Sequence, residues 1–238
     1  MGPHPLACAR RPTRVPKDRL WPSGGSVIHP DTEIRFVRPE IGVGVFATRF
    51  IPRGTITWVP DQLDSRFTPA QFTAMPRLMQ EYVDRYSFVD STGSYVLCWD
   101  HARYMNHNCR PNIRGLGELV DIAVRDIHPG EELTCEYAGF NLATSLRCMC
   151  GETCCRQMIL TGDLWQWFSE WDAEVAAAAA NVGSVSQPIL HLASLPASGL
   201  RLLEGLAKNE RLELPSIRTS WCPTVVREDT SGLSQTGT

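Results

Sequence analysis

The stretch RYMNHNCRPN, residues 103–112, places asparagine, histidine and cysteine side chains unusually close together. Asn106, His107 and Cys109 lie within four positions, and Pro111 and Asn112 follow. Asparagine and proline favour turns, so the stretch predicts an irregular loop. By itself the loop fits an Asx-type turn with a hydrogen-bonded histidine equally well, and its meaning depends on the segments around it.

Cysteines cluster farther along the chain. Residues 148–156 read CMCGETCCR, so four of the nine cysteines fall within eight positions. Nine is odd, and the N-terminus lacks the layout of a secretory signal, so the cluster indicates a metal site rather than a disulfide framework. A redox-active thiol–disulfide pair is the competing interpretation, but it leaves Cys109 unexplained.

Glycines interrupt an apolar segment near the N-terminus. Residues 42–46 read GVGVF, and glycine lets a backbone approach a ligand closely. A glycine-containing strand is also commonly just a bulge, and the strand–GxGxxG–helix context of a dinucleotide site is missing.

The rest of the pattern predicts a mostly β fold with short helices. Strand-like segments separated by Gly/Pro turns fall at residues 34–37, 42–47, 54–59, 94–98, 119–124 and 132–135. Residues 68–86 predict one helix, with Thr68 as its cap. Residues 163–180 predict an amphipathic helix with Trp165, Phe168, Trp171 and Val175 along one side, and a second helix follows near 198–208.

Composition limits the function. The 238 residues carry a net charge of −3 and no apolar run near the ~20 residues that cross a bilayer. We therefore expect a cytoplasmic protein without membrane contact. The acidic balance argues against direct nucleic-acid binding and suits a basic protein partner.

Taken together, in this order and spacing, the motifs resemble the SET-domain family of protein lysine methyltransferases, of bacterial type, with a cysteine-rich post-SET segment. The motifs are the loop at 106–112, GEELTCEY at 130–137 and the cysteine cluster. The resemblance covers residues 32–156. It implies a SET-domain fold, in which small β-sheets surround a threaded pseudoknot loop, followed here by a C-terminal helical extension.

The resemblance also divides the chain into regions. Residues 1–28 are expected to be a flexible basic, proline-rich tail, and residues 29–140 the SET domain with an insert at about 61–93. Residues 141–160 would be the post-SET zinc segment. Residues 161–215 would form the helical extension, and 216–238 a disordered tail.

The family's roles carry over residue by residue. Tyr137 matches the catalytic tyrosine, and Cys135, Tyr137 and Phe140 would line the substrate channel. The resemblance implies that S-adenosylmethionine binds at Gly42, Gly44, Val45, Phe46, Arg103, Tyr104, Asn106, His107 and Met158. Gln157 and Glu136 stand where relatives usually carry glycine and aspartate.

The resemblance assigns a structural zinc ion to Cys109, Cys148, Cys150 and Cys155. Four thiolates suit a closed tetrahedral zinc site. The ion would tie the segment at residues 141–160, here called the flap, to the loop at 106–112. The choice between Cys154 and Cys155 stays open, although the CxC-x4-C spacing favours Cys155.

The implied reaction is methyl transfer from S-adenosylmethionine to the ε-amine of a lysine in a basic protein or peptide. Cys135 is smaller than the Phe or Tyr that many relatives carry there, so we expect room for di- or trimethylation. No dedicated general base is evident in the sequence. The alternative is a catalytically weak or inactive zinc-stabilised SET module that acts as a protein-interaction domain.

Overall fold

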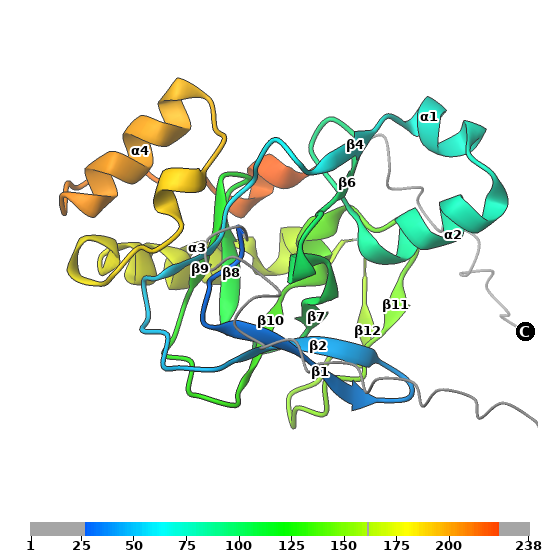
Figure 1. Ribbon diagram of the computed structural model, residues 1–238, viewed down its shortest axis with the longest axis horizontal. Helices are drawn as coiled ribbons and strands as arrows, with labels where there is room; N and C mark the ends of the chain where they lie inside the picture. Colours follow the sequence, from blue (N-terminus) through cyan, green and yellow to red (C-terminus); the bar gives the residue numbers. More distant parts are fainter. Residues whose placement is uncertain (1–26, 161, 224–238) are drawn as a thin grey trace, which may run out of the picture.

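The computed structural model (Figure 1) describes residues 27–160 and 162–223, in which four small β-sheets surround a main hydrophobic core and a smaller second cluster. Short helices connect and flank the sheets, and the longer helices α3 and α4 lie at one end. The predicted fold class is confirmed: small sheets with short helices, followed by a C-terminal helical extension. The predicted N-terminal tail lies outside the described residues except for Val27 and Ile28, which are buried.

The largest sheet joins segments that are far apart in the sequence. Strands β1 (Thr32–Arg38) and β2 (Gly42–Ala47) form an antiparallel hairpin. Strand β10 (Glu132–Cys135) pairs antiparallel with β2 and parallel with β7 (Asn106–His107). The sheet order β1-β2-β10-β7 therefore brings together the glycine-containing segment at 42–46, the loop at 106–112 and the GEELTCEY segment at 130–137.

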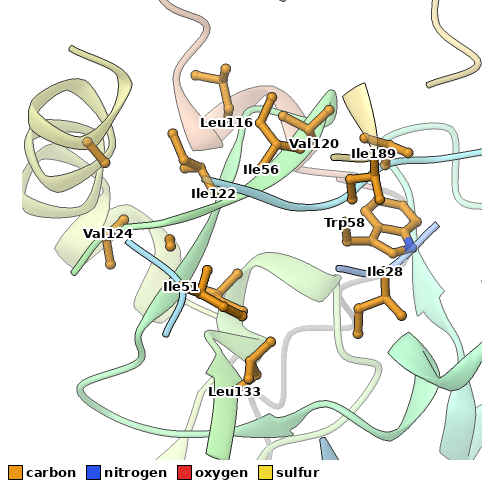
Figure 2. Packing of buried hydrophobic residues seen from close by; sticks show 14 of the residues in the cluster. Ile28, Ile51, Ile56, Trp58, Leu116, Val120, Ile122, Val124, Leu133 and Ile189 are labelled. Atoms are coloured by element: carbon orange, nitrogen blue, oxygen red, sulfur yellow. The ribbon is translucent and has the colours of Figure 1, made fainter. Parts of the chain in front are cut away.

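Two three-stranded sheets and a small hairpin complete the β structure. The first contains β3 (Ile56–Trp58), β9 (Val120–Ala123) and β8 (Ile113–Leu116), in that order. The second contains β4 (Ser65–Phe67), β6 (Tyr95–Leu97) and β5 (Phe88–Val89). Strands β11 (Leu146–Arg147) and β12 (Met158–Ile159) pair beyond them. Branched apolar side chains such as Ile51, Ile56 and Leu133 fill the core (Figure 2).

The insert contains two helices, so the prediction of one helix over residues 68–86 is wrong. Helix α1 (Pro69–Ala74) begins at Thr68, which forms the predicted cap. Helix α2 (Arg77–Tyr86) follows after Pro76. A residue before proline avoids helical geometry, and Met75 is extended at φ −69° and ψ 152°. Pro76 therefore ends the first helix.

The C-terminal extension contains α3 (Asp163–Ala179) and α4 (Ala197–Ala207). The buried side of α3 carries Leu164, Trp171 and Val175. Trp165, predicted to lie on that side, is 47% exposed, so this part of the predicted stripe is wrong. Its ring instead meets Trp221 at 5.6 Å between centroids, outside the core.

The predicted disorder from residue 216 onward is wrong for the first residues of that segment. The 3-10 helix η6 (Ile217–Ser220) is tied to α3, because the Ile217 N–H donates to Asp172 Oδ1 at 2.8 Å. Asn141, at φ 52°, donates to the Ser220 carbonyl at 2.6 Å and accepts from the Cys222 N–H at 2.8 Å. This amide bridge holds the segment against the domain. Residues 224–238 lie outside the described part.

None of the helices in the described ranges combines the length and the apolar character needed to pass through a bilayer.

Candidate functional site

Gly42 and Gly44 on β2 and Asn106 on β7 form a narrow region, here called the glycine–asparagine strip, where β2, β10 and β7 meet. The Asn106 side-chain amide donates to the Val43 carbonyl at 3.1 Å and to Glu132 Oε1 at 2.7 Å. A Cβ on Gly44 would collide with the Glu132 carboxylate and come within 2.9 Å of the Asn106 amide. A side chain at position 44 would therefore displace the bonded Glu132 carboxylate and Asn106 amide. A Cβ added to Gly42, which has φ 93°, would meet no atom within 4 Å, so its side of the strand is open.

His107 is a buried hydrogen-bond acceptor. Its Nδ1 accepts the Tyr137 N–H at 3.3 Å, and its Nε2 lies 3.5 Å from Cys109 Sγ. Burial, together with the charge of Arg156, lowers the pKa of His107 to about 3. The imidazole is therefore neutral at physiological pH, and it links the cysteine loop to the start of the segment that carries Tyr137.

Tyr137 begins the short 3-10 helix η3 (Tyr137–Phe140), directly after β10. Its hydroxyl donates to the Met105 carbonyl at 2.8 Å. Its ring stacks on Phe140, with 5.2 Å between centroids and an interplanar angle of 29°. Burial raises the pKa of the Tyr137 phenol above its usual value, so the group stays protonated. The hydroxyl is thus fixed in place between two elements.

A cavity of about 370 Å³ opens beside Tyr137. Cys135, Tyr137 and Phe140, the three predicted channel residues, all line it, with aromatic walls from Trp58 and Phe88. Cys135 is 5% exposed and contributes only a small thiol to the wall. The cavity can therefore enclose an apolar side-chain stem next to a fixed hydroxyl.

The four cysteines predicted as metal ligands lie together. The sulfur atoms of Cys109, Cys148, Cys150 and Cys155 are all within 4.8 Å of one another. Cys154 is exposed and outside the cluster. Backbone N–H groups point at two of the sulfurs: Arg156 N lies 3.4 Å from Cys109 Sγ, and Gln157 N lies 3.3 Å from Cys155 Sγ. Such bonds favour thiolates, the form that binds metal.

The flap keeps the turn that its usual glycine would favour. Gln157 has φ 66°, in the left-handed region. The residue also accepts the Cys148 N–H at its carbonyl, 2.8 Å away, which closes the turn across the cysteines. The substitution of glycine by glutamine therefore leaves the shape of the flap unchanged, at the expense of local strain.

Arg156 connects the flap to Tyr137. Its guanidinium donates to both oxygens of Glu136 at 2.8 Å and pairs with Asp163 at 3.2 Å. Glu136 in turn accepts the Ala138 N–H and so fixes the start of η3. Burial raises the pKa of Glu136, and Arg156 opposes that shift. The charge pair thus orients the segment that holds the phenol.

Arg156→Ala should destabilise the fold by about 3 kcal/mol, because it leaves the Glu136 carboxylate buried without its partner. Arg77→Ala, which breaks the exposed pair with Glu81, should change stability by about 0.5 kcal/mol or less. Without Arg156 the pKa of folded Glu136 rises further above its unfolded value. The stability that Arg156→Ala loses relative to wild type should therefore grow as pH rises from 5 to 8. Urea unfolding at both pH values measures this, and equal effects of the two variants would contradict it.

The remaining predicted cofactor residues lie around the same sheet but differ in what they expose. Val45 is fully buried in the core, whereas Phe46 is half-buried on the opposite face of β2, under Arg35. Arg103 lines the cavity, while Tyr104 packs against Tyr86. Met158 is 40% exposed on β12.

Several residues with a part in the site were missed from the sequence. Glu132 positions Asn106, and Arg156 pairs with Glu136. Glu132 was visible in GEELTCEY, but its partner depends on the parallel pairing of β7 with β10, which no local pattern reveals. The Arg156 pair likewise needs the flap to fold back over η3.

Comparison with known proteins agrees with this arrangement. The SET domain family model matches residues 42–138. A histone-lysine N-methyltransferase of Schizosaccharomyces pombe, H3 lysine-9 specific, is 29% identical over 155 residues, covering 51% of this chain and 31% of the relative. The H3 lysine-4 specific enzyme of the same yeast is 40% identical over 62 residues, covering 23% and 7%.

The chain thus spans less than a third of the length of these relatives. Among solved structures, KRYPTONITE in complex with mCHG DNA and SAH aligns at TM-score 0.36 and 22% identity, over 51% of this chain and 27% of that one. The sequence resemblance is confirmed. Residues 42–138 of this chain match the SET domain family model, and the chain is similar to histone-lysine methyltransferases over part of their length.

Proposed function

We propose that this chain transfers methyl groups from S-adenosylmethionine to the ε-amine of a lysine in a basic protein. One observation carries the proposal: the Tyr137 hydroxyl is fixed beside a cavity of side-chain size, next to the glycine–asparagine strip. The SET domain and its histone-methylating relatives support the same conclusion. Histone-like proteins, rich in lysine, are the substrate class we propose for an acidic chain.

The residues present fit the methyl donor. The absence of a side chain at position 44 lets the Glu132 and Asn106 side chains pack against β2, and the open side of Gly42 leaves backbone accessible. We propose that Gly42, Gly44, Val45 and Phe46 hold the donor through their backbones. Arg103, Tyr104, Asn106, His107 and Met158 would complete its pocket. When bound, S-adenosylmethionine supplies a methyl group on a positively charged sulfur.

The chain's own groups then position and desolvate the amine. Oxygen atoms of Tyr137 and Met105 lie together at the cavity and can accept weak C–H···O contacts that steer a methyl group. The aromatic walls at Trp58, Phe88 and Phe140 disfavour a charged amine, which lowers the pKa of an entering lysine below its usual ~10.4.

We propose that Cys109, Cys148, Cys150 and Cys155 bind a structural zinc ion. Zinc holds sulfur ligands at about 2.3 Å, and four sulfurs already within 4.8 Å of one another need only a small contraction to reach that geometry. The ion would join the flap at residues 141–160, the proposed post-SET segment, to the SET domain at 29–140. No step of the reaction passes through it.

Isothermal calorimetry of S-adenosylmethionine with the zinc-loaded chain tests the donor site. We expect one molecule bound per chain, with adenosine triphosphate giving no heat as the control. Asn106→Ala should weaken binding because it removes the side chain that shapes the strip. A folded chain that gives no heat would refute the proposal. Binding without transfer to any lysine would leave the interaction-module alternative.

Cys135→Tyr should restrict the product to monomethyl-lysine, because a phenol would fill cavity space that the thiol leaves open. The wild type and the Cys135→Ser control should both proceed to di- or trimethyl-lysine. Mass spectrometry over a time course of peptide methylation measures the product ratio. A wild-type enzyme that stops at monomethyl-lysine would contradict the prediction.

A further inference from the structure

Asp121 places a carboxylate in the wall of the cavity beside Tyr137. Side chains alternate along a strand, and its neighbours on β9, Val120 and Ile122, point into the core at 2% and 0% exposure. Asp121 therefore points to the other side, where it lines the cavity together with Cys135 and Tyr137.

The carboxylate has no partner there. Across residues 27–160 and 162–223, neither a hydrogen-bond donor nor a cation contacts its oxygens; only its backbone carbonyl accepts a bond, from Thr57 Oγ1 at 3.3 Å. Burial alone raises the pKa of Asp121 to about 7. An isolated carboxylate in such a place destabilises a fold, so a functional reason for it is expected.

The groups that face Asp121 cannot neutralise it. The thiols of Cys98 and Cys135 have pKa values raised by burial, and the phenol of Tyr137 is also protonated, so all three are uncharged. Arg114, on the adjacent strand β8, is engaged by Glu174 and stacks on Trp171 at 4.9 Å. Arg103, which also lines the cavity, donates to the Cys98 carbonyl at 3.3 Å and lies over the Tyr104 ring, so no cation among the described residues contacts the Asp121 carboxylate.

Of the other acids that line the cavity, Asp84 is exposed on α2, and Glu118, Asp90 and Glu136 are already bonded. Glu118 accepts from the Ser91 N–H and hydroxyl at 2.6 Å, and Asp90 pairs with Arg66 at 2.7 Å. Glu136 is held by Arg156. Asp121 differs from these three because its carboxylate is unbonded, and its charge acts on the neighbouring thiol of Cys135.

We propose that Asp121 receives the ammonium group of the substrate lysine and takes its proton before methyl transfer. The inference rests on the proposed function. The proton passes from the lysine nitrogen to the carboxylate, which leaves a neutral amine and a carboxylic acid. The amine nitrogen then bonds to the methyl carbon as the carbon–sulfur bond breaks, with its electron pair left on sulfur. The acid returns its proton to water when the product leaves.

The two pKa values make the proton transfer feasible. In water a lysine holds its proton far more strongly than an aspartic acid. The apolar cavity disfavours both charged forms, which lowers the pKa of the amine and has already raised that of the carboxyl. In the cavity, the lysine amine and the Asp121 carboxylate therefore have pKa values much closer to each other than in water, as general-base catalysis requires.

Asp121→Asn tests the inference, with Asp126→Asn as the control for the same change outside the cavity, on the turn that contacts the Arg53 N–H. Steady-state methylation of a lysine peptide is followed from pH 6 to 9. For Asp121→Asn we expect kcat/KM at pH 7 to fall by about 100-fold. In the wild type, kcat/KM should rise with pH near 7 as Asp121 ionises, and this rise should be absent from Asp121→Asn. Asp126→Asn should keep both the rate and the rise with pH.

A second readout needs neither donor nor substrate. The pKa of Asp121 is higher in the folded chain than in the unfolded chain. The carboxylate therefore does not destabilise the fold below about pH 4, and it destabilises the fold increasingly as pH rises through about 7. Asp121→Asn should therefore raise Tm at pH 8 by about 3 °C or more, and by less at pH 5. A lowered Tm would show that the carboxylate has a structural role and would overturn the inference.

The outcomes separate the inference from the function it rests on. An active wild type with an equally active Asp121→Asn variant and an unchanged rise with pH would overturn the inference alone. A wild type that binds donor but methylates no lysine would overturn both. Loss of donor affinity in Asp121→Asn, measured by calorimetry, would assign the residue to the donor site instead.

Discussion

Tyr137→Phe should lower methyl transfer to a lysine peptide by at least about 100-fold, the size of effect that one positioned hydroxyl typically contributes in a transition state. The hydroxyl is held by the Met105 carbonyl at the cavity wall, and the variant removes only this oxygen. Folding should survive, because the loss of one hydrogen bond costs about 1 kcal/mol. Initial rates with a radiolabelled donor measure the effect.

Two controls make this result specific. Tyr82→Phe makes the same change on a tyrosine that is 45% exposed on α2, and it should leave the rate unchanged. Donor affinity of Tyr137→Phe, measured by calorimetry, should stay within about threefold of wild type if the hydroxyl acts mainly in the transition state. Equal labelling by Tyr137→Phe and wild type would remove Tyr137 from its proposed role.

Cys109→Ser should remove the zinc ion and unfold the flap from the domain. Cys109 is on the loop after β7, whereas Cys148, Cys150 and Cys155 are on the flap, so the loss of this one sulfur disconnects the two segments. Structural zinc contributes several kcal/mol or more to such small modules. We expect the metal content to fall from one ion per chain to near zero, and the Tm to fall by about 10 °C or more.

Cys154→Ser is the matched control, because this neighbouring cysteine is exposed and outside the cluster. It should keep its zinc and its Tm, whereas Cys155→Ser should behave like Cys109→Ser. Metal content is measured by plasma mass spectrometry after dialysis, and Tm by calorimetry. A zinc-free Cys154→Ser with a zinc-loaded Cys155→Ser would show that the cluster is wrongly assigned.

Much of the site could be predicted because its residues stand in short, chemically distinctive segments. Asn106, His107 and Cys109 share one loop, and the flap cysteines lie within eight positions. The family resemblance implies that the flap folds back so that its cysteines meet Cys109, and the structure places the four sulfurs together. Thr68 and Pro69 likewise marked a helix start that the structure contains.

The failures have local causes. Pro76 was a visible helix breaker, but the apolar spacing across residues 72–83 was given more weight, so two helices were predicted as one. Trp165 falls at helical spacing with Trp171 and Val175, which predicts the buried side of α3, whereas Leu164 occupies that side in the structure. The ordered segment at η6 depends on Asn141, a residue far away in sequence, and no local pattern predicts that contact.

Asp121 shows a different limit. In the sequence it is one polar residue in an apolar strand, which is what a half-buried strand normally contains. Only the assembly of β9, β10 and η3 around one cavity makes its outer side part of the cavity wall. A general base therefore could not be inferred before the sheets were assembled.

The most direct test of lysine methylation uses a methyl donor whose methyl group is deuterated. Lysine-rich histone H3 and other basic proteins are incubated with this donor and the zinc-loaded chain, and the products are analysed by tandem mass spectrometry. The account predicts deuterated methyl groups on lysine side chains, carried by wild type and greatly reduced with Tyr137→Phe. Label found on other residue types, or no label from a folded chain that binds the donor, would contradict it.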